Sequence, residues 1–345
     1  MHISALLATT AALLSASGAR AAPAASEEQL NAIVARADNS YQIPKCTTGY
    51  PPGYDAKKAN VAFPQAQSAT TTVTCPANYT QVVQVSAYVV LPYFKYKNGT
   101  TEGYMTPDQL TAPVKQMQTN FGKYKLPGRV NFTIKTPIYK PITNRTLWEE
   151  MFNQDTDTQE NYDRLVRTLV RPIRGPLENR TTDQYQRLYI YLPPSLATAT
   201  AFAFLPYSTA PFDADGVYFD ARYWLYSLST LTHETGHWMS LLHNFQGGCS
   251  NDQGGDLVND TPPWTLTGNL YEAMCANSLK YGYPYDYNKI SNPCNGTKTQ
   301  AVVSIRNFMN YSMDVCKTDF TSLQLKRMWN ALTTLRGFKP KCVQL

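Results

Sequence analysis

Three of the four histidines of this chain lie within eleven residues, at His233, His237 and His243. Residues four apart on a helix project from the same face, so His233 and His237 can present their imidazoles to one point. Neutral imidazoles at that spacing can bind one Zn²⁺, each at about 2.0–2.1 Å. The spacing therefore predicts a metal centre on a helix.

Glu234 and His243 extend this pattern. Glu234 cannot reach such a metal as readily as a histidine, but it can reach a metal-bound water and take its proton. His243 becomes the third ligand if the helix ends after His237 and the chain turns back under the metal. Three protein ligands leave the open coordination position that a catalytic zinc needs. A bare His-Glu-x-x-His also occurs by chance, but the clustering of three histidines favours a metal site.

The segment around these histidines has apolar residues at helical spacing, including Leu231 and Trp238, which predicts a buried helix. Before it, β-rich runs alternate with helical patterns, and strands interleaved with helices indicate an α/β lobe. A helix is expected to start at Thr106-Pro107, with Pro113 kinking or restarting it. The other expected elements are strands at 82–91, 129–135 and 186–192 and a helix at 159–170.

Beyond Phe245 the composition changes to Gly, Asn, Asp, Pro and Cys, with little periodicity until residues 323–335. We therefore expect one catalytic domain at 81–345. Its upper lobe would cover 81–243, and its lower lobe, 244–345, would be loop-rich and stapled by disulfides.

The N-terminal residues are typical of a secretory signal, with a short apolar core and a small-residue cleavage site, so 1–21 are predicted to be a signal peptide. Residues 22–80 would form a leader and N-terminal extension. Seven cysteines and eight Asn-x-Ser/Thr triplets agree with a secreted, extracellular glycoprotein. No later apolar run is long enough to span a bilayer, so no membrane association is expected.

The net charge of +6 comes from scattered basic residues, which excludes the basic stripe typical of nucleic-acid binding. A Ser/His/Asp hydrolase is excluded as well, because the remaining histidine, His2, lies in the predicted signal. Protein or peptide substrates and a monomeric chain are expected.

From residue 233 the sequence reads His-Glu-Thr-Gly-His-Trp-Met-Ser-Leu-Leu-His, and 307–312 read Asn-Phe-Met-Asn-Tyr-Ser. With the intervening segments 247–249 and 255–262, this order resembles the pappalysin-type metzincin zinc metalloproteases, most closely the secreted fungal extracellular ones. The resemblance is strong over about 225–330. It implies a metzincin-like α/β fold, with a twisted mixed β-sheet and the zinc helix in the N-terminal lobe.

The resemblance also implies roles for single residues. Zinc would be held by His233, His237 and His243, with Glu234 as general base and acid. Met309 would form an apolar floor under the histidines, and the phenol of Tyr311 would donate to the oxyanion of a tetrahedral intermediate. Substrate would lie along an edge strand near 201–207.

The implied function is secreted zinc-dependent hydrolysis of peptide bonds in extracellular proteins. Two positions depart from the family pattern. The expected glycine is Ser240, at a site where positive φ is expected, and the expected acidic residue is Asn310. The alternative is therefore a secreted zinc-containing binding protein with little or no turnover.

Asp256, the Val258 carbonyl and Thr261 resemble a calcium-binding loop of some relatives, and a turn held by Asp–backbone hydrogen bonds is an equal competitor. Four C-terminal cysteines permit three pairings. The resemblance favours Cys249–Cys294 with Cys275–Cys316. For the other three, a Cys46–Cys75 bond with Cys342 free, a bond from Cys342 to one of them, and a latency role for Cys46 all stay open.

Overall fold

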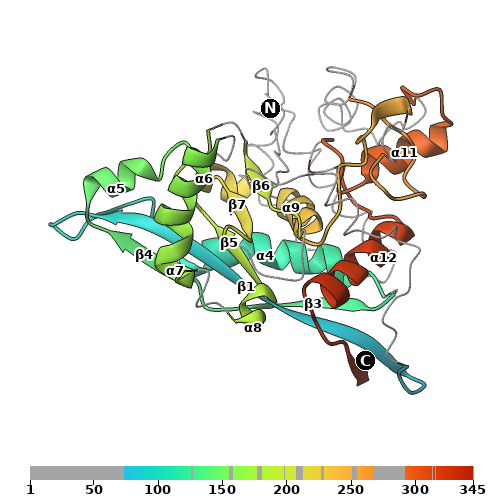
Figure 1. Ribbon diagram of the computed structural model, residues 1–345, viewed down its shortest axis with the longest axis horizontal. Coiled ribbons are helices and arrows are strands. Elements are labelled where there is room, and N and C mark those ends of the chain that lie inside the picture. Colours follow the sequence, from blue (N-terminus) through green and yellow to red (C-terminus); the bar gives the residue numbers. More distant parts are fainter. Residues whose placement is uncertain are drawn as a thin grey trace, which may run out of the picture.

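The structure is a computed structural model that describes residues 74–125, 127–154, 158–176, 181–197, 199–206, 213–226, 229–250, 255–266, 292–312, 314 and 316–344. The predicted signal peptide, most of the predicted leader, Cys46 and Cys275 lie outside these residues. An eight-stranded mixed sheet crosses the described part, with helices on both faces (Figure 1). The α/β fold with a mixed sheet that the sequence and the resemblance imply is thus confirmed.

The long strand β1 (Tyr79–Lys95) organises this sheet, because it pairs along both edges. One edge carries the parallel strands β3 (Arg129–Ile134) and β4 (Ile138–Ile142). The other edge carries, in order, antiparallel β8 (Lys341–Gln344), parallel β5 (Arg187–Tyr191) and antiparallel β2 (Thr101–Glu102). Beyond β5 the sheet continues with parallel β7 (Val217–Phe219) and antiparallel β6 (Ala201–Ala203). Strand β1 begins at Tyr79, two residues before the predicted domain boundary.

Side chains alternate between the two faces of the sheet, as strand geometry requires. On one face Val83, Val85 and Val89 of β1 belong to a core cluster with helices α4 (Pro107–Gly122), α9 (Thr230–Trp238) and α12 (Ser322–Asn330). On the other, Val90 and Phe94 belong to a second cluster. Its helical partners are α5 (Arg145–Glu150), α6 (Gln159–Leu165), a π-helical turn (Val166–Val170), α7 (Arg171–Arg174) and α8 (Thr182–Tyr185). Each fully buried aliphatic or aromatic side chain contributes about 1.5–3 kcal/mol.

Helix α4 continues through Pro113, so of the two expected outcomes, a kink or a restart, the restart does not occur. A proline inside a helix leaves the carbonyl four residues earlier without its backbone donor. Here that carbonyl is Gln109, and the indole Nε1 of Trp224 donates to it at 3.2 Å. Trp224 lies in a 3₁₀ helix (Ala221–Tyr226) that leads towards α9. The bond lost at Pro113 is thus replaced by one that ties α4 to the approach of the candidate site.

The C-terminal part contains a helix that hydrophobic periodicity missed, α11 (Lys298–Arg306). Its sequence signal is a capping box in which Thr297 and Gln300 exchange side-chain and backbone hydrogen bonds. A 3₁₀ turn (Gly248–Ser250) precedes it, and α12 continues into a π-helical turn (Ala331–Leu335). Strand β8, near the C-terminal end of the predicted lower lobe, pairs with β1 in the central sheet.

Two disulfides are defined. Cys249 bonds to Cys294, which is one bond of the interleaved pairing that the resemblance implies. Cys316 is also disulfide-bonded, while Cys275 lies outside the described residues. Cys75 bonds to Cys342, so the Cys46–Cys75 arrangement is wrong and the alternative that ties the C-terminal tail holds. This bond is favoured because β8 pairs with the start of β1 and brings the two cysteines to one end of the sheet.

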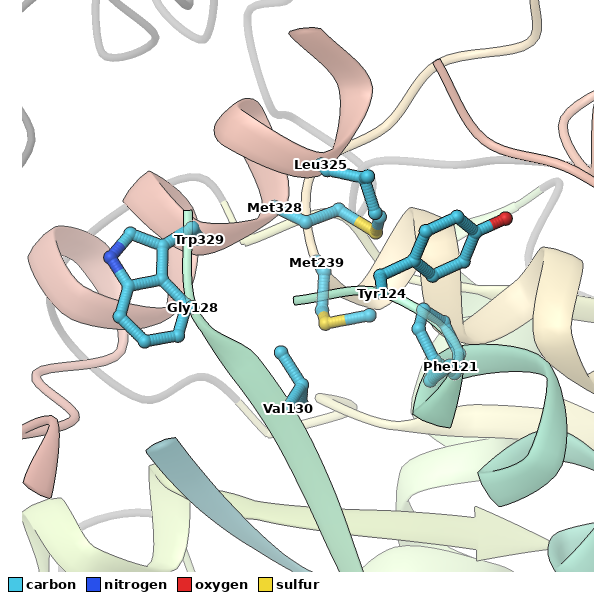
Figure 2. A pocket seen from close by; sticks show the side chains of 8 residues that line it. All are labelled: Phe121, Tyr124, Gly128, Val130, Met239, Leu325, Met328 and Trp329. Atoms are coloured by element: carbon cyan, nitrogen blue, oxygen red, sulfur yellow. The ribbon is translucent and has the colours of Figure 1, made fainter. Parts of the chain in front are cut away.

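Over the ranges that the structure describes, no helix combines the length and the apolar character needed to cross a membrane. A small apolar pocket of about 20 Å³ lies between α4, β3 and α12, beside Met239 (Figure 2). Trp329 reaches it because Gly128 has no side chain: a Cβ on Gly128 would lie 2.3 Å from the indole. The pocket lining has no histidine, cysteine or carboxylate, so this pocket is distinct from the candidate metal centre.

Candidate metal centre

The predicted helix break after His237 is present. Helix α9 ends at Trp238, and Ser240 has a φ of 81°, the positive value expected at this position. The backbone N–H of Leu241 then donates to the carbonyl of Gly236 at 2.9 Å, which closes a tight turn. This turn brings His243 back beneath the helix, where it joins His233 and His237.

The three histidines direct their Nε2 atoms at one another. The Nε2 atom of His237 lies 3.0 Å from that of His233 and 3.2 Å from that of His243. The Nδ1 atoms of His233 and His237 each lie 2.6 Å from a backbone carbonyl, those of Phe308 and Leu241. A carbonyl only accepts, so both Nδ1 atoms carry the proton.

This tautomer leaves the Nε2 lone pairs of His233 and His237 facing each other at contact distance. Such an arrangement is repulsive unless a cation lies between the nitrogens. Two nitrogens bound to one tetrahedral Zn²⁺ at about 2.0–2.1 Å are separated by about 3.3 Å, close to the observed spacing. The donor set therefore fits zinc, and the carbonyl partners are the orienting contacts that metal-binding histidines commonly make.

Burial keeps these histidines neutral. All three are at most 5% exposed. Desolvation lowers the pKa of His237 to about 3 and those of His233 and His243 well below their ordinary value, with the positive charge of Lys317 adding to the effect on the latter two. Neutral imidazole is the form that binds a metal.

Met309 lies against the middle of α9. A Cβ atom on Gly236 would lie 2.6 Å from the Sδ atom of Met309, so the methionine occupies the space beside the backbone between His233 and His237. Met309 is fully buried, and the Asn244 N–H donates to its carbonyl at 3.2 Å. Glu234, which follows His233, is fully buried as well.

Two aromatic rings contact the third histidine. The Tyr311 ring packs edge-on against His243 with centroids 4.7 Å apart, which places Tyr311 beside the histidine cluster. Phe245 stacks on His243 at 4.7 Å and 9°. Phe245 was not among the residues predicted for the site, although an aromatic residue two positions after a candidate ligand is a local signal in the sequence.

Asn310 belongs to a buried hydrogen-bond network beside the site. Its Nδ2 donates to the Asn244 Oδ1 at 3.0 Å, while the Asn244 Nδ2 donates to the carbonyl of Ser304. Its Oδ1 accepts from the backbone of Ser312. An amide suits this buried position better than a carboxylate, because the partner is an oxygen that needs a donor.

Charged side chains hold both ends of the helix. At the N-terminus, the Asp314 carboxylate accepts from the backbone N–H groups of Ser229 and Thr230 at 3.1 and 3.2 Å. Burial opposes ionisation of Asp314, but the charge of Lys317 and these hydrogen bonds outweigh it and lower the pKa of Asp314 to about 2. At the C-terminus, the guanidinium of Arg336 donates to the Trp238 carbonyl.

The two C-terminal contacts differ in their partners. Arg336 forms a fully buried ion pair with Asp215 at 2.9 Å. Arg327 of α12 donates to the carbonyl of Ser240 at 2.8 Å, which supports the turn before His243. Both arginines come from the C-terminal part of the chain: Arg327 is 87 residues from Ser240, and Arg336 is 98 residues from Trp238.

Asp256, Val258 and Thr261 also lie together. The Thr261 Oγ1 atom is 2.7 Å from both Asp256 carboxylate oxygens and 2.5 Å from the Val258 carbonyl. One hydroxyl proton serves only one of these three acceptors. The Val258 N–H also donates to Asp256, which is the turn that competes with calcium, and burial raises the pKa of Asp256 to about 7.

Comparisons with known proteins found similar peptidases. Residues 179–333 match the model of the peptidase family described as pregnancy-associated plasma protein-A. Extracellular metalloprotease 1 of Coccidioides posadasii is 40% identical over 110 residues, 32% of each chain. An extracellular metalloprotease of Neurospora crassa is 34% identical over 161 residues, 42% of this chain and 49% of that one. The chain thus spans between a third and a half of the length of these relatives.

Among solved structures, mature mirolysin of Tannerella forsythia in complex with a cleaved peptide is 16% identical. The match covers 75% of this chain and 94% of that one, with a TM-score of 0.46. The family match contains all three histidines and the Met309 turn, and it confirms the resemblance predicted from the sequence.

Proposed function

We propose that this chain, whose residues 179–333 match the pregnancy-associated plasma protein-A peptidase model, is a secreted zinc endopeptidase that hydrolyses peptide bonds in extracellular proteins. One observation carries the proposal: three buried imidazoles direct their Nε2 atoms to one point, and the glutamate that follows the first of them is buried as well. The extracellular metalloproteases similar to it, and the predicted signal peptide, support secretion.

His233, His237 and His243 would hold the zinc through Nε2. When bound, zinc supplies Lewis-acid polarisation of the scissile carbonyl and lowers the pKa of water towards 7. Glu234 takes the proton of the attacking water and passes it to the leaving amine, so one carboxylate serves both steps. The Tyr311 phenol donates to the oxyanion that develops on the carbonyl.

Strand β6 would guide the substrate. It ends the sheet order β2-β1-β5-β7-β6 and contacts α9 directly. An extended peptide added along an edge strand gains main-chain hydrogen bonds that depend little on its sequence.

The alternative, a zinc-containing binding protein without turnover, rests on Ser240 and Asn310. The fold accommodates both residues through local backbone geometry or hydrogen bonds. Ser240 adopts the positive φ of the turn, and the Asn310 amide is hydrogen-bonded to Asn244 and Ser312. These contacts favour the enzyme.

Hydrolysis of casein by the purified protein tests the proposal. Glu234→Ala is expected to abolish hydrolysis while zinc stays near one equivalent, because the ligands remain and the base is lost. His243→Ala is expected to lower zinc content as well. Glu160→Ala, an exposed glutamate on α6, is the control and keeps full activity. Zinc-loaded wild type without hydrolysis would support the binding protein, and full zinc and activity in His243→Ala would contradict the ligand set.

We further propose that Ca²⁺ binds at Asp256, the Val258 carbonyl and Thr261. When Asp256 is ionised, the one hydroxyl proton of Thr261 faces three acceptor oxygens. A bound cation would satisfy all of these oxygens at once. Calcium added to zinc-loaded protein in calcium-free buffer should raise the melting temperature, and Asp256→Asn should remove the effect. An unchanged melting temperature in the wild type would favour the simple turn.

A further inference from the structure

Helix α9 lacks a local cap. Its N-cap residue, Ser229, makes no capping hydrogen bond with its own side chain. The first N–H groups of a helix have no partner inside the helix, so a buried helix start needs an acceptor from elsewhere. Asp314, 84 to 85 residues further along the chain, supplies that acceptor.

Asp314 makes an unusually complete contact with this helix start. Besides the two backbone N–H groups, its carboxylate accepts from the hydroxyls of Ser229 and Thr230, at 2.9 Å each. The Asp314 carbonyl lies 3.1 Å from the same Ser229 hydroxyl and competes with the carboxylate for its one proton. Lys317 pairs with the same carboxylate at 2.9 Å with its side chain only 7% exposed, so the negative charge is held at the positive end of the helix.

The same stretch of chain contacts α9 at two further points. The Phe308 carbonyl accepts from the Nδ1 of His233, and Met309 packs against Gly236. Asp314, Phe308 and Met309 therefore contact the helix at its start, at its first candidate ligand and at its centre. A helix fixed at these points cannot rotate or slide relative to Tyr311, which belongs to the same stretch.

We infer that Asp314 is a positioning residue of the hydrolytic site: by capping α9 it fixes Glu234 and His233 relative to Tyr311. This inference deepens the proposed function and rests on it. Glu234 lies in the second turn of the helix, so a change in the first turn displaces the base directly. A displacement of about 1 Å in a reacting group can reduce a rate by about 100-fold.

The test compares Asp314→Asn with a matched loss of a helix cap elsewhere. Asn144 caps α5 by accepting from the Leu147 N–H at 3.1 Å, on the opposite face of the sheet, so Asn144→Ala is the control. We expect Asp314→Asn to lower kcat by about 10- to 100-fold, with KM within about twofold and zinc near one equivalent. Asn144→Ala should lower the melting temperature and leave kcat unchanged.

Thr230→Val supplies a second variant, because it removes one donor to Asp314 and keeps the side-chain shape. The double variant should be no slower than Asp314→Asn alone, as expected if both residues act through one contact. Additive losses in the double variant would overturn the inference. So would an unchanged kcat in Asp314→Asn, or a kcat that falls only in proportion to zinc.

Hydrogen exchange separates this inference from the proposed function. The backbone amides of α9 should exchange faster in Asp314→Asn than in Asn144→Ala, whether or not the protein hydrolyses peptides. If Glu234→Ala left hydrolysis unchanged, the proposed function would fail, and exchange alone would then decide the role of Asp314. Equal exchange in the two variants overturns it.

Discussion

The Sδ atom of Met309 lies where Gly236 would otherwise carry a side chain, 2.6 Å from the position of a Cβ atom. Gly236 stands between the two histidines of α9, so the methionine supports the helix backbone at the centre of the candidate site. A glycine in a helix usually costs stability. Here it permits a contact that a larger residue would prevent.

Gly236→Ala should therefore destabilise the protein by about 1–2 kcal/mol, because overpacking exceeds the gain in helix propensity. Zinc content should fall with it, since the backbone between two ligands must move. Urea unfolding and metal analysis measure both. Gly122→Ala, in α4, is the control: no atom lies within 4 Å of its added Cβ, so it should be neutral or stabilising. Equal stability of the two variants would contradict the Met309 contact.

Ser240→Gly should stabilise the protein by about 1 kcal/mol, because φ is 81° at this residue and glycine adopts that value without strain. The Ser240 hydroxyl is also buried with no hydrogen-bond partner among the described residues. Ser240→Ala separates the two causes, since it removes the hydroxyl and keeps the Cβ. Thermal unfolding of the three proteins measures the difference, and a less stable glycine variant would refute the strain.

Asn310→Asp should destabilise the folded protein at pH 7 by about 1–3 kcal/mol. A carboxylate cannot donate to the Asn244 Oδ1, which would lose its buried donor. Asn98→Asp, at an exposed turn, is the control and should have no effect. Chemical denaturation of both variants decides, and an Asn310→Asp protein as stable as the control would show that the amide is dispensable.

Asp314 should make the free energy of unfolding depend on pH in the acidic range. Its pKa is about 2 in the folded protein, below the value of about 3.9 in an unfolded chain. Its contribution is therefore fully present above about pH 5 and is lost as the pH falls towards 2. The difference in unfolding free energy between metal-free wild type and Asp314→Asn should shrink by about 2 kcal/mol over that interval. A difference that stays constant from pH 5 to pH 2.5 would contradict the lowered pKa.

Much of the candidate site was predictable because the sequence patterns that indicate it involve residues close together in the chain. The four-residue spacing of His233 and His237 fixes a shared helix face, and the positive φ at Ser240 was expected from the motif. The strands at 129–135 and 186–192 were found within one residue at each end, since alternation is also a local signal.

The remaining features depend on contacts between distant parts of the chain. Nothing in the sequence near Pro113 indicates that the Trp224 indole will donate to the Gln109 carbonyl, so the sequence predicted only that Pro113 would kink or restart the helix. Asp314 and Arg336 likewise form hydrogen bonds with the two ends of α9. These contacts join segments that no short-range sequence pattern connects. The capping box that begins at Thr297 is visible in the sequence, but helix α11 was not predicted because the residues after it lack hydrophobic periodicity.

The Cys75–Cys342 bond closes almost the whole described chain into a covalent ring, since the two cysteines are 267 positions apart. A single proteolytic nick inside the ring opens it without releasing a fragment. The nicked protein keeps the mass of the intact one plus one water, and its two pieces separate only after reduction. A chain built in this way tolerates attack on its surface loops, because the severed ends stay tethered to the sheet that they fold against.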